Sequence, residues 1–296
     1  MNKCGYIAVI GKPNVGKSTL INHIVGEKVS IVTAKPQTTR HQILAIATKV
    51  SGQMLFIDTP GMHVGQKKAL NKFMNKTAAN AVLDVDLILF LVESMKWSAD
   101  DEQALKALEY SKTDVILVIN KADLIKQKER LLPFANNVFQ KYAFKEIFYI
   151  SASKGKGVED LEEKIFKYLP ESENYFSEDQ LTDKSTRYLV SELIREQLML
   201  RFHQELPYSL TVEVESFKDK GHIVHIHALI WVEREIQKNM LIGKGGESMK
   251  HVGIHSRQSI QDLIGNKVHL KLWVKVKSAW ADNDRLLQQL GYKEEY

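Results

Sequence analysis

The eight residues Gly11–Ser18 read GKPNVGKS and match the pattern G-x-x-x-x-G-K-[ST]. The pattern follows an apolar run at 6–10 and opens a helical stretch at 18–25, the context that a phosphate-binding loop requires. Its glycines let backbone N–H groups wrap a phosphate chain, and the helix N-terminus adds a positive dipole. Lys17 is expected to reach the β- and γ-phosphates, and Ser18 to ligate Mg²⁺. The expected nucleotide-binding residues of this loop are Gly11, Lys12, Pro13, Asn14, Val15, Gly16, Lys17, Ser18 and Thr19.

A second candidate group, Asp58-Thr59-Pro60-Gly61, follows the apolar run 54–57. An acid at the carboxyl end of a buried strand can lie beside Mg²⁺, and the Gly61 N–H can meet the γ-phosphate. Taken alone, these residues would more often be an ordinary turn, because Asp, Pro and Gly are turn formers. Their position about 40 residues after the phosphate-binding loop favours the metal role. The nucleotide-binding candidates here are Asp58, Thr59, Pro60, Gly61 and Met62.

A base-recognition candidate, Asn120-Lys121-Ala122-Asp123, follows the apolar run 115–119. The Asp123 carboxylate can accept both the N1–H and the exocyclic amino group of guanine, a pair of donors that adenine lacks. Asp123 would therefore select GTP over ATP. Asn120 would brace the loop, and the stem of Lys121 would cover the face of the ring.

Ser151 and Ala152 follow the last apolar run of this part, 147–150. The Ala152 N–H would close the base pocket. This signal is weak, because a Ser-Ala-Ser sequence is usually only a turn.

Strand-like and helix-like stretches alternate through this part of the chain. Continuous apolar runs suit strands that are covered on both faces. The alternation predicts an α/β domain, residues 1–170, with a mostly parallel, doubly wound sheet. The expected strands are 6–10, 40–50 (half-buried, at an edge), 54–57, 87–92, 115–119 and 147–150, and the expected helices are 18–25, 68–83, 101–110, 128–142 and 158–169.

A length of 296 residues exceeds what one compact core usually holds, so we expect two domains. Pro170 ends the last helix of the first part, and the acidic, polar residues 171–183 are the predicted linker. The pattern then changes to helix, strand, strand, two helices, strand and helix, which predicts an α+β domain over 184–296. Its expected elements are a helix at 189–202, strands at 210–217 and 223–232, a helical stretch to 264, a strand at 268–276 and a helix at 279–290.

The composition, with 44% hydrophobic and 26% charged residues, is that of a globular protein. No apolar run approaches the roughly 18 residues of a membrane span, and the N-terminus has no apolar segment long enough for a signal peptide. The single cysteine, Cys4, excludes an intrachain disulfide and fits a reducing compartment. We therefore expect a cytoplasmic protein. A monomer is a further expectation, which the sequence does not establish.

The positive charge is unevenly distributed around a formal net charge of +5. Residues 1–170 hold 24 basic against 17 acidic side chains, and residues 238–277 hold 8 basic against 2 acidic. A basic segment between acidic flanks suits a nucleic-acid or anionic-membrane surface. It is also compatible with a merely solvated face.

The basic segment contains Ile242-Gly243-Lys244-Gly245-Gly246, which matches the I-G-x-x-G loop of KH domains. Such loops clamp the backbone of single-stranded nucleotides between two helices. The order of elements resembles the type II KH fold. A plain glycine turn and a membrane-facing basic surface are the alternatives. The expected RNA-binding residues are Ile242, Gly243, Lys244, Gly245, Gly246 and Lys250.

The motifs of the first part together resemble the GTPase superfamily. GTPases place a threonine after the first helix that reaches Mg²⁺ only when the γ-phosphate is present. In the stretch Lys35–Arg40 the resemblance implies Thr39 for this role, with Thr38 as the runner-up. The resulting metal set is Ser18, Thr39 and Asp58.

The sequence departs from Ras-like GTPases at Met62, which stands where they carry a water-orienting glutamine. Asn14 resembles the P-loop asparagine of potassium-activated GTPases, where it helps to hold K⁺ in the place of an arginine finger. Asn14 is equally well a turn residue. The expected catalytic residues are Lys17, Thr39, Asn14 and Gly61, and the expected cofactors are GTP or GDP and Mg²⁺, with K⁺ as a candidate.

A GTPase domain of this motif set followed by a type II KH domain resembles the Era family of bacterial ribosome-assembly GTPases. The likeness covers essentially the whole chain and includes the P-Q-T-T-R-H stretch and Trp280-Ala281-Asp282. The resemblance implies a GTP-hydrolysing switch that binds small-subunit ribosomal RNA near its 3′ end and acts in 30S assembly and maturation. It also implies partial, peripheral association with the inner face of the cell membrane.

Two other classes of function stay open at this stage. One is an RNA-binding module whose nucleotide site is slow or structural, which Met62 allows. The other is a membrane-peripheral GTPase regulator, which the basic segment 238–277 allows.

Overall fold

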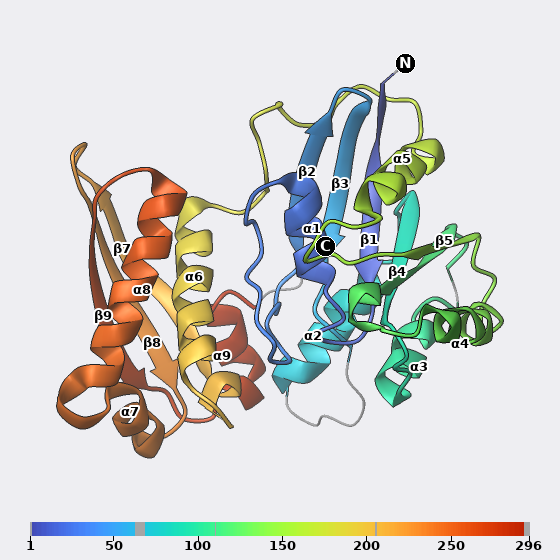
Figure 1. Cartoon of the computed structure of the whole chain (residues 1–296). Coiled ribbons are helices and arrows are strands. Elements are labelled where there is room, and N and C mark those ends of the chain that lie inside the picture. The colour runs from blue at the N-terminus through green and yellow to red at the C-terminus, as the bar shows by residue number, and fades with distance from the viewer. Residues whose placement is uncertain (1, 63–68, 110, 205, 293–296) are drawn as a thin grey trace. The chain divides into compact units, whose positions relative to one another are not determined.

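The structure is a computed structural model that describes residues 2–62, 69–109, 111–204 and 206–292. Contacts divide the chain into two compact units (Figure 1). The first comprises the described residues up to 62 and those from 71 to 183, and the second comprises 69–70 and the described residues from 184 onward. Each unit has its own hydrophobic core.

The first unit is built around a six-stranded sheet with the order β2-β3-β1-β4-β5-β6. All neighbouring strands are parallel except β2 and β3, which pair in antiparallel fashion as a hairpin. Apolar side chains from both faces of the sheet are buried in separate clusters, as expected for strands that helices cover on both sides. The strands are β1 (Lys3–Ile10), β2 (Ile43–Lys49), β3 (Gly52–Asp58), β4 (Leu87–Glu93), β5 (Val115–Asn120) and β6 (Glu146–Tyr149).

Among the described residues up to 170, five α-helices alternate with the strands as the sequence predicts (Figure 1). Because β1, β3, β5 and β6 run parallel, their carboxyl ends lie at one edge of the sheet. The four candidate motifs follow these ends, so the fold gathers them at one place, as is general for open α/β sheets. The helices are α1 (Lys17–Val25), α2 (Ala69–Asn80), α3 (Ala99–Lys106), α4 (Leu131–Phe139) and α5 (Val158–Tyr168), with short 3₁₀ turns η1 (Ala122–Leu124) and η2 (Lys128–Arg130).

Residues 171–183, the predicted linker, lie along the sheet of the first unit. The Ile46 N–H donates to the Leu181 carbonyl at 2.9 Å, and the Leu44 N–H donates to the Asp183 carboxylate at 3.1 Å. The buried side chain of Gln53 accepts the N–H groups of residues 175 and 176, both at 3.1 Å. The segment is therefore attached to β2, the strand that follows the Lys35–Arg40 stretch.

The second unit is a three-stranded sheet with the order β7-β8-β9, in which β8 is antiparallel to β7 and parallel to β9. Alternate residues of β8, from Val224 to Val232, are buried in the core with the apolar side of α6. This pattern confirms the α+β prediction. The elements are α6 (Thr186–Arg201), η3 (Leu206–Tyr208), β7 (Leu210–Asp219), β8 (Val224–Val232), α7 (Glu235–Ile242), η4 (Lys244–Gly246), α8 (Glu247–Ile264), β9 (Val268–Val276), η5 (Trp280–Asp282) and α9 (Asp284–Gln289).

Several elements differ from the sequence-based expectation. The helix expected at 101–110 lies at Ala99–Lys106, and the one expected at 128–142 is the 3₁₀ turn η2 followed by α4 at Leu131–Phe139. Two other differences have a clear cause. The edge strand expected at 40–50 begins only at Ile43, because the Arg40 side chain is buried and its segment follows an irregular path. The last expected helix, 279–290, is broken: Trp280 is buried in a 3₁₀ turn, and Asn283 then caps a new helix by accepting the Leu286 N–H at 3.1 Å.

Within the parts of the chain that the structure describes, every helix is too short or too polar to span a bilayer.

Candidate functional site

The phosphate-binding loop connects β1 to α1 in a conformation that two glycines permit. Gly11 and Gly16 have φ of 154° and 103°. A Cβ on Gly11 would collide with the carbonyl oxygen of Leu91, and one on Gly16 with the side-chain amide of Asn120. Both positions thus require glycine for backbone conformation and for close approach.

Lys17 is the most buried cation of the loop, with 6% of its surface exposed. Its Nζ donates to the carbonyl oxygens of Gly11 at 2.9 Å and Lys12 at 3.0 Å, so the side chain folds back over the loop. Burial lowers the pKa of Lys17 to about 8, although the charge of Asp58 opposes this shift. A buried ammonium with only carbonyl partners is suited to an anionic ligand, which would restore its full charge.

Ser18, Thr39 and Asp58, the predicted metal set, converge. Ser18 Oγ donates to Asp58 Oδ2 at 2.7 Å and lies 2.9 Å from Thr39 Oγ1, which is 3.5 Å from the same carboxylate oxygen. Asp58 is fully buried, and its Oδ1 has no hydrogen-bond partner among the described residues. Burial raises the pKa of Asp58, against the hydrogen bond from Ser18 and the charge of Lys17. Two hydroxyls and a carboxylate oxygen in need of a partner form a hard oxygen set that fits Mg²⁺.

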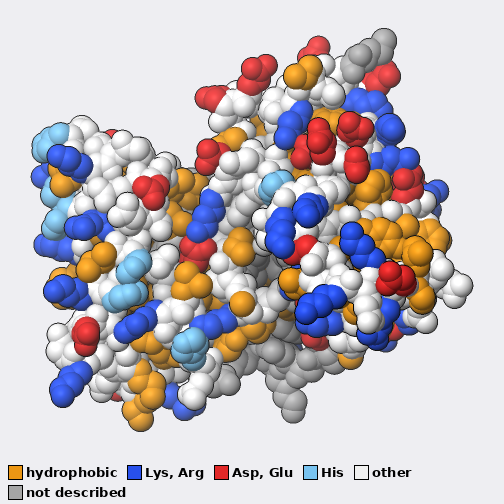
Figure 2. Space-filling model, viewed as in Figure 1, with side chains coloured by type: hydrophobic (Ala, Val, Ile, Leu, Met, Phe, Trp, Pro, Cys, Tyr) orange, Lys and Arg blue, Asp and Glu red, His pale blue; other side chains and the backbone are white. Residues whose placement is uncertain are grey.

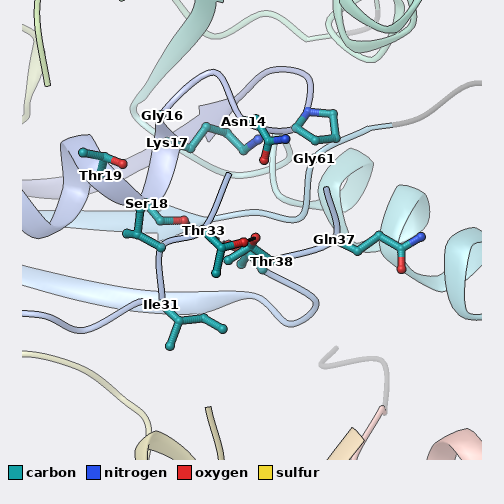
Figure 3. A pocket seen from close by; sticks show the side chains of 13 residues that line it. Asn14, Gly16, Lys17, Ser18, Thr19, Ile31, Thr33, Gln37, Thr38 and Gly61 are labelled. Atoms are coloured by element: carbon teal, nitrogen blue, oxygen red, sulfur yellow. Dashed lines mark hydrogen bonds between the residues drawn. The ribbon is translucent and has the colours of Figure 1, made fainter. Parts of the chain in front are cut away.

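The two candidate threonines point in different directions. Thr39 faces Ser18, whereas Thr38 Oγ1 donates to the Lys35 carbonyl at 2.7 Å and meets Thr33 Oγ1 at the same distance. Figure 3 shows Thr33 and Thr38 side by side and Gln37 pointing away from the phosphate-binding loop. The structure therefore brings only Thr39 into the oxygen set.

The Asn14 side chain leaves the phosphate-binding loop toward the Lys35–Arg40 stretch. Its Nδ2 donates to the Ala34 carbonyl at 2.8 Å, and its backbone has a positive φ of 62°. Asn14 is thus both a turn residue and a contact between the two loops that border the phosphate site.

Three other candidate side chains turn away from the site. Lys12 Nζ is bound by Asp101 Oδ2 at 2.6 Å, at the start of α3. Thr59 Oγ1 donates to the Val9 carbonyl at 2.8 Å. Met62 is 3% exposed and lies in the core cluster on one face of the sheet. At these positions only the backbone can face a nucleotide.

The base-recognition loop is braced by Asn120. Its Nδ2 donates to the Val15 carbonyl at 2.7 Å, and its Oδ1 accepts the N–H groups of Lys121 at 2.7 Å and Ala152 at 3.0 Å. These contacts agree with the predicted bracing role, because the Asn120 side chain connects the base-recognition loop to the phosphate-binding loop and to the Ser151–Ala152 loop. The Ala152 N–H, expected to face the base, is donated to Asn120.

The remaining two residues of the base-recognition loop are positioned by ion pairs. Lys121 Nζ contacts Glu93 at 2.9 Å and the Asn14 carbonyl at 2.7 Å, so the Lys121 side chain extends to the phosphate-binding loop. The Asp123 carboxylate meets Lys154 Nζ at 2.8 Å, and this contact holds the pKa of Asp123 below its ordinary value. A charged Asp123 is the form that accepts two donors from guanine.

In the second unit, the glycine loop joins α7 to α8. Gly243, Gly245 and Gly246 all have positive φ, and a Cβ on Gly245 or Gly246 would meet no atom within 4 Å. The loop backbone is therefore open, Lys244 is exposed beside it, and the N-terminus of the 18-residue helix α8 follows directly. Exposed N–H groups at a helix N-terminus suit a phosphate.

Several residues that contact the loops of the nucleotide site were not identified by the sequence analysis. Gln37 is buried, with a φ of 59°, and its Nε2 donates to Asn71 Oδ1 at 2.9 Å. Glu93 and Lys154 position the base loop through ion pairs. Each partner is distant in sequence or depends on a loop conformation, so spacing alone could not have identified it.

A phosphate-binding loop, a magnesium-type oxygen set and an N-K-x-D loop at one edge of a parallel sheet define a P-loop GTPase domain, here joined to a KH fold. Family models agree. The family described as a 50S ribosome-binding GTPase matches residues 6–121, and the KH domain family matches residues 205–281.

The chain belongs to the GTPase Era family. GTPase Era of Pseudomonas fluorescens is 48% identical over 290 residues, which cover 98% of this chain and 97% of that protein. GTPase Era of Histophilus somni is 51% identical over 294 residues, with coverage of 99% and 98%.

Two solved structures resemble the chain over 99% of its length at 36% identity, and both are covered completely. One is Era in complex with MgGDPNP and nucleotides 1506–1542 of 16S ribosomal RNA, with a TM-score of 0.96. The other is Aquifex aeolicus Era bound to GDP and AlF₄⁻, with a TM-score of 0.93. The predicted family and fold class are thereby confirmed.

Proposed function

We propose that the protein is a GTP-hydrolysing switch that binds small-subunit ribosomal RNA near its 3′ end and acts in assembly and maturation of the 30S subunit. The observation that carries the enzymatic part is the convergence of Ser18, Thr39 and Asp58 beside buried Lys17. The RNA part is supported by the open glycine loop and by the relative that holds 16S ribosomal RNA.

Each residue of the nucleotide site has a proposed task. Lys17 donates to the β- and γ-phosphates, and the Gly61 N–H to the γ-phosphate. Ser18, Thr39 and Asp58 hold Mg²⁺, which neutralises phosphate charge when bound. Thr39 lies in the loop between α1 and β2. We propose that this loop holds Thr39 against Mg²⁺ only while the γ-phosphate is present, so that its conformation differs between the GTP and GDP states.

The remaining site residues select and enclose the nucleotide. Asp123 accepts two hydrogen bonds from guanine, and the Lys121 stem covers the ring. Asn120 keeps the base loop aligned with the phosphate-binding loop through its 2.7 Å hydrogen bond to Val15.

The attacking water is oriented without a side chain from position 62, because Met62 is packed in the core. We propose K⁺ as the activating cation, held with the help of the Asn14 amide oxygen. The 2.8 Å bond from Asn14 Nδ2 to the Ala34 carbonyl supports this, since it places the side chain between the two loops that border the phosphate site. Hydrolysis should be faster in K⁺ than in Na⁺, and Asn14→Ala should remove the difference while GTP affinity stays similar.

The domain limits 1–170, 171–183 and 184–296, a monomeric state and a cytoplasmic location remain parts of the proposal. Peripheral binding to the inner membrane face is supported by the charge of the segment 238–277, with 8 basic against 2 acidic residues. Flotation with vesicles containing anionic lipid, at low and high salt, tests the membrane part.

The main test compares RNA binding and turnover in one preparation. The affinity for a 3′-terminal fragment of small-subunit ribosomal RNA should be higher with a non-hydrolysable GTP analogue than with GDP. Single-turnover phosphate release should proceed with GTP. The alternative is an RNA-binding module with a structural nucleotide site, and the burial of Met62 is the observation in its favour. It predicts that RNA affinity does not depend on the nucleotide and that no phosphate is released.

A further inference from the structure

The sheet of the second unit has one face that α6 and α8 do not cover, although Thr211 and Leu229 on that face are buried. The alternate residues of β8 that point into the core belong to the same cluster as α6 and α8, so these helices lie on one side of the sheet. The intervening residues of β8 and β9 point to the other side, which we call the outer sheet face. Its main members are His225, His227 and Trp231 of β8 and Lys271, Trp273 and Lys275 of β9.

Trp273 is an exposed ring of this face, with 59% of its surface accessible. A tryptophan offers a large apolar ring with a polar N–H, and such rings are enriched at binding interfaces. Lys271 and Lys275 lie two residues before and after it on the same side of β9, at roughly 7 Å along the strand. An exposed ring thus stands between two cations.

Trp231 repeats this arrangement on the neighbouring strand. Its Cα pairs with that of Lys275, and the ammonium groups of Lys275 and Lys277 lie 5.9 and 5.4 Å from the centre of its ring. Its Nε1 donates to Glu213 at 2.8 Å, which fixes the orientation of the ring. The face therefore carries two tryptophans and three lysines in alternation.

Histidines extend the face toward the other end of the strands. The rings of His225 and His269 lie 5.1 Å apart. Burial and the charge of Lys220 lower the pKa of His225, so its ring is largely neutral at neutral pH. Among the described residues, no group of three His, Cys, Asp or Glu side chains is placed to hold a metal ion. Figure 2 shows His and Lys side chains gathered at the left margin of the view, where Figure 1 places β7 and β9.

Rings and cations in alternation match single-stranded RNA, whose bases stack on aromatic planes while its phosphates contact lysines. A membrane surface would require a continuous apolar strip to insert, but here each tryptophan is flanked by lysines. A second copy of the chain would bring the lysines of both faces together, which is repulsive. We propose that the outer sheet face is a second RNA-binding surface, on which a base stacks on Trp273 and the adjoining phosphates contact Lys271 and Lys275.

This inference rests on the RNA-binding function proposed above and extends it. The glycine loop joins α7 to α8, and α8 packs on the core side of the sheet. A short RNA can occupy only the glycine loop, whereas a longer RNA can occupy both surfaces and gain affinity from the second contact.

The test uses the full-length protein and two RNAs from the 3′ end of small-subunit ribosomal RNA, one of about 8 and one of about 40 nucleotides. The variants are Trp273→Ala and Lys271→Ala/Lys275→Ala on the outer sheet face, and Gly245→Asp in the glycine loop. Lys106→Ala/Lys112→Ala, in the first unit, removes the same charge and serves as the control. All four positions of the lysine variants are exposed, and circular dichroism confirms folding.

Both outer-face variants should bind the long RNA at least about fivefold more weakly and the short RNA as the wild type does. The double lysine variant should also lower the salt dependence by about two ions. The control should match the wild type within about twofold. Gly245→Asp should weaken both RNAs.

Other outcomes overturn one statement or the other. If only Gly245→Asp weakens the long RNA, the second surface is refuted and the proposed function stands. If no variant has a lower affinity for either RNA, both the second surface and the proposed RNA-binding function are refuted. If the outer-face variants bind the RNAs normally but lose affinity for anionic vesicles, or change the sedimentation of the protein, the face contacts a membrane or a second copy and the inference is wrong.

Discussion

The nucleotide site and the glycine loop both present a helix N-terminus and glycines to phosphate, yet they are built in opposite ways. In the first, Lys17 and Asp58 are buried, and both are held by hydrogen bonds to neighbouring groups of the site. In the second, Lys244 is exposed and a side-chain atom added to Gly245 or Gly246 would meet open space. One site is enclosed and preorganised, and the other is an open backbone.

The difference follows from what each site must do. Hydrolysis requires charges that are fixed in a water-poor environment, where electrostatic interactions are strong and need no reorganisation. A continuous RNA strand must enter and leave along its whole length, so an enclosed pocket would exclude it. Single substitutions should therefore have large effects in the enclosed site and smaller, salt-dependent ones in the open loop.

Lys17→Ala tests the enclosed site and should have the largest effect. Removing a buried, hydrogen-bonded cation is expected to weaken Mg·GTP binding by about 100- to 1,000-fold. Lys12→Ala is the matched control, because the Lys12 side chain is held by Asp101 away from the site, and it should cost only a few-fold. Titration calorimetry measures both. Equal losses for the two variants would refute a special role for the buried lysine.

Asp123→Asn should change which base is bound. The amide can donate to the C2 carbonyl of xanthine but no longer accepts two donors from guanine, so GTP affinity should fall by about 100-fold while XTP affinity rises. Lys154→Ala, which removes only the ion-pair partner of Asp123, should reduce GTP affinity much less. An unchanged preference for GTP in Asp123→Asn would place the base pocket elsewhere.

Gly246→Asp tests the open loop against an isosteric control. Gly246 has a φ of 79°, which asparagine tolerates better than most residues, so Gly246→Asn isolates the effect of the added charge. The aspartate should weaken RNA binding by at least about tenfold through repulsion of a phosphate, and the asparagine by less. Lys244→Ala should lower the affinity a few-fold and the salt dependence by about one ion. Filter binding over a salt series measures these effects, while the rate of GTP hydrolysis without RNA should stay within about twofold for all three.

The smallest effect concerns protons at the nucleotide site. Burial lowers the pKa of Lys17 to about 8, and bound phosphate favours its charged form. The free protein therefore loses the proton as the pH rises through 8, and nucleotide binding at pH 9 should take up as much as about one proton, with affinity falling as the pH rises. Calorimetry in buffers of different ionisation enthalpy detects this. Proton uptake equal at pH 7 and 9, or absent at both, would contradict the buried state of Lys17.

Features that depend on local chemistry could be predicted from the sequence alone. The phosphate-binding loop, the bracing residue Asn120 and the helix–strand order of both units follow from glycine conformations, residue spacing and apolar periodicity. These signals are contained within a few residues or within one repeating pattern, so they can be recognised without knowing which distant segments meet.

Other features depended on which distant segments come together, and only the tertiary structure decided them. Which of the two hydroxyls, that of Thr38 or that of Thr39, lies beside Ser18 depended on the path of the loop before β2. The attachment of residues 171–183 depended on a free edge of β2, and a polar composition alone cannot reveal that a backbone edge is available. The exposure of Trp273 beside two lysines became visible only once the helices were seen to cover the other face of the sheet. In each case sequence fixes the residue type, but the direction of a side chain is set by packing between segments that are far apart in the chain.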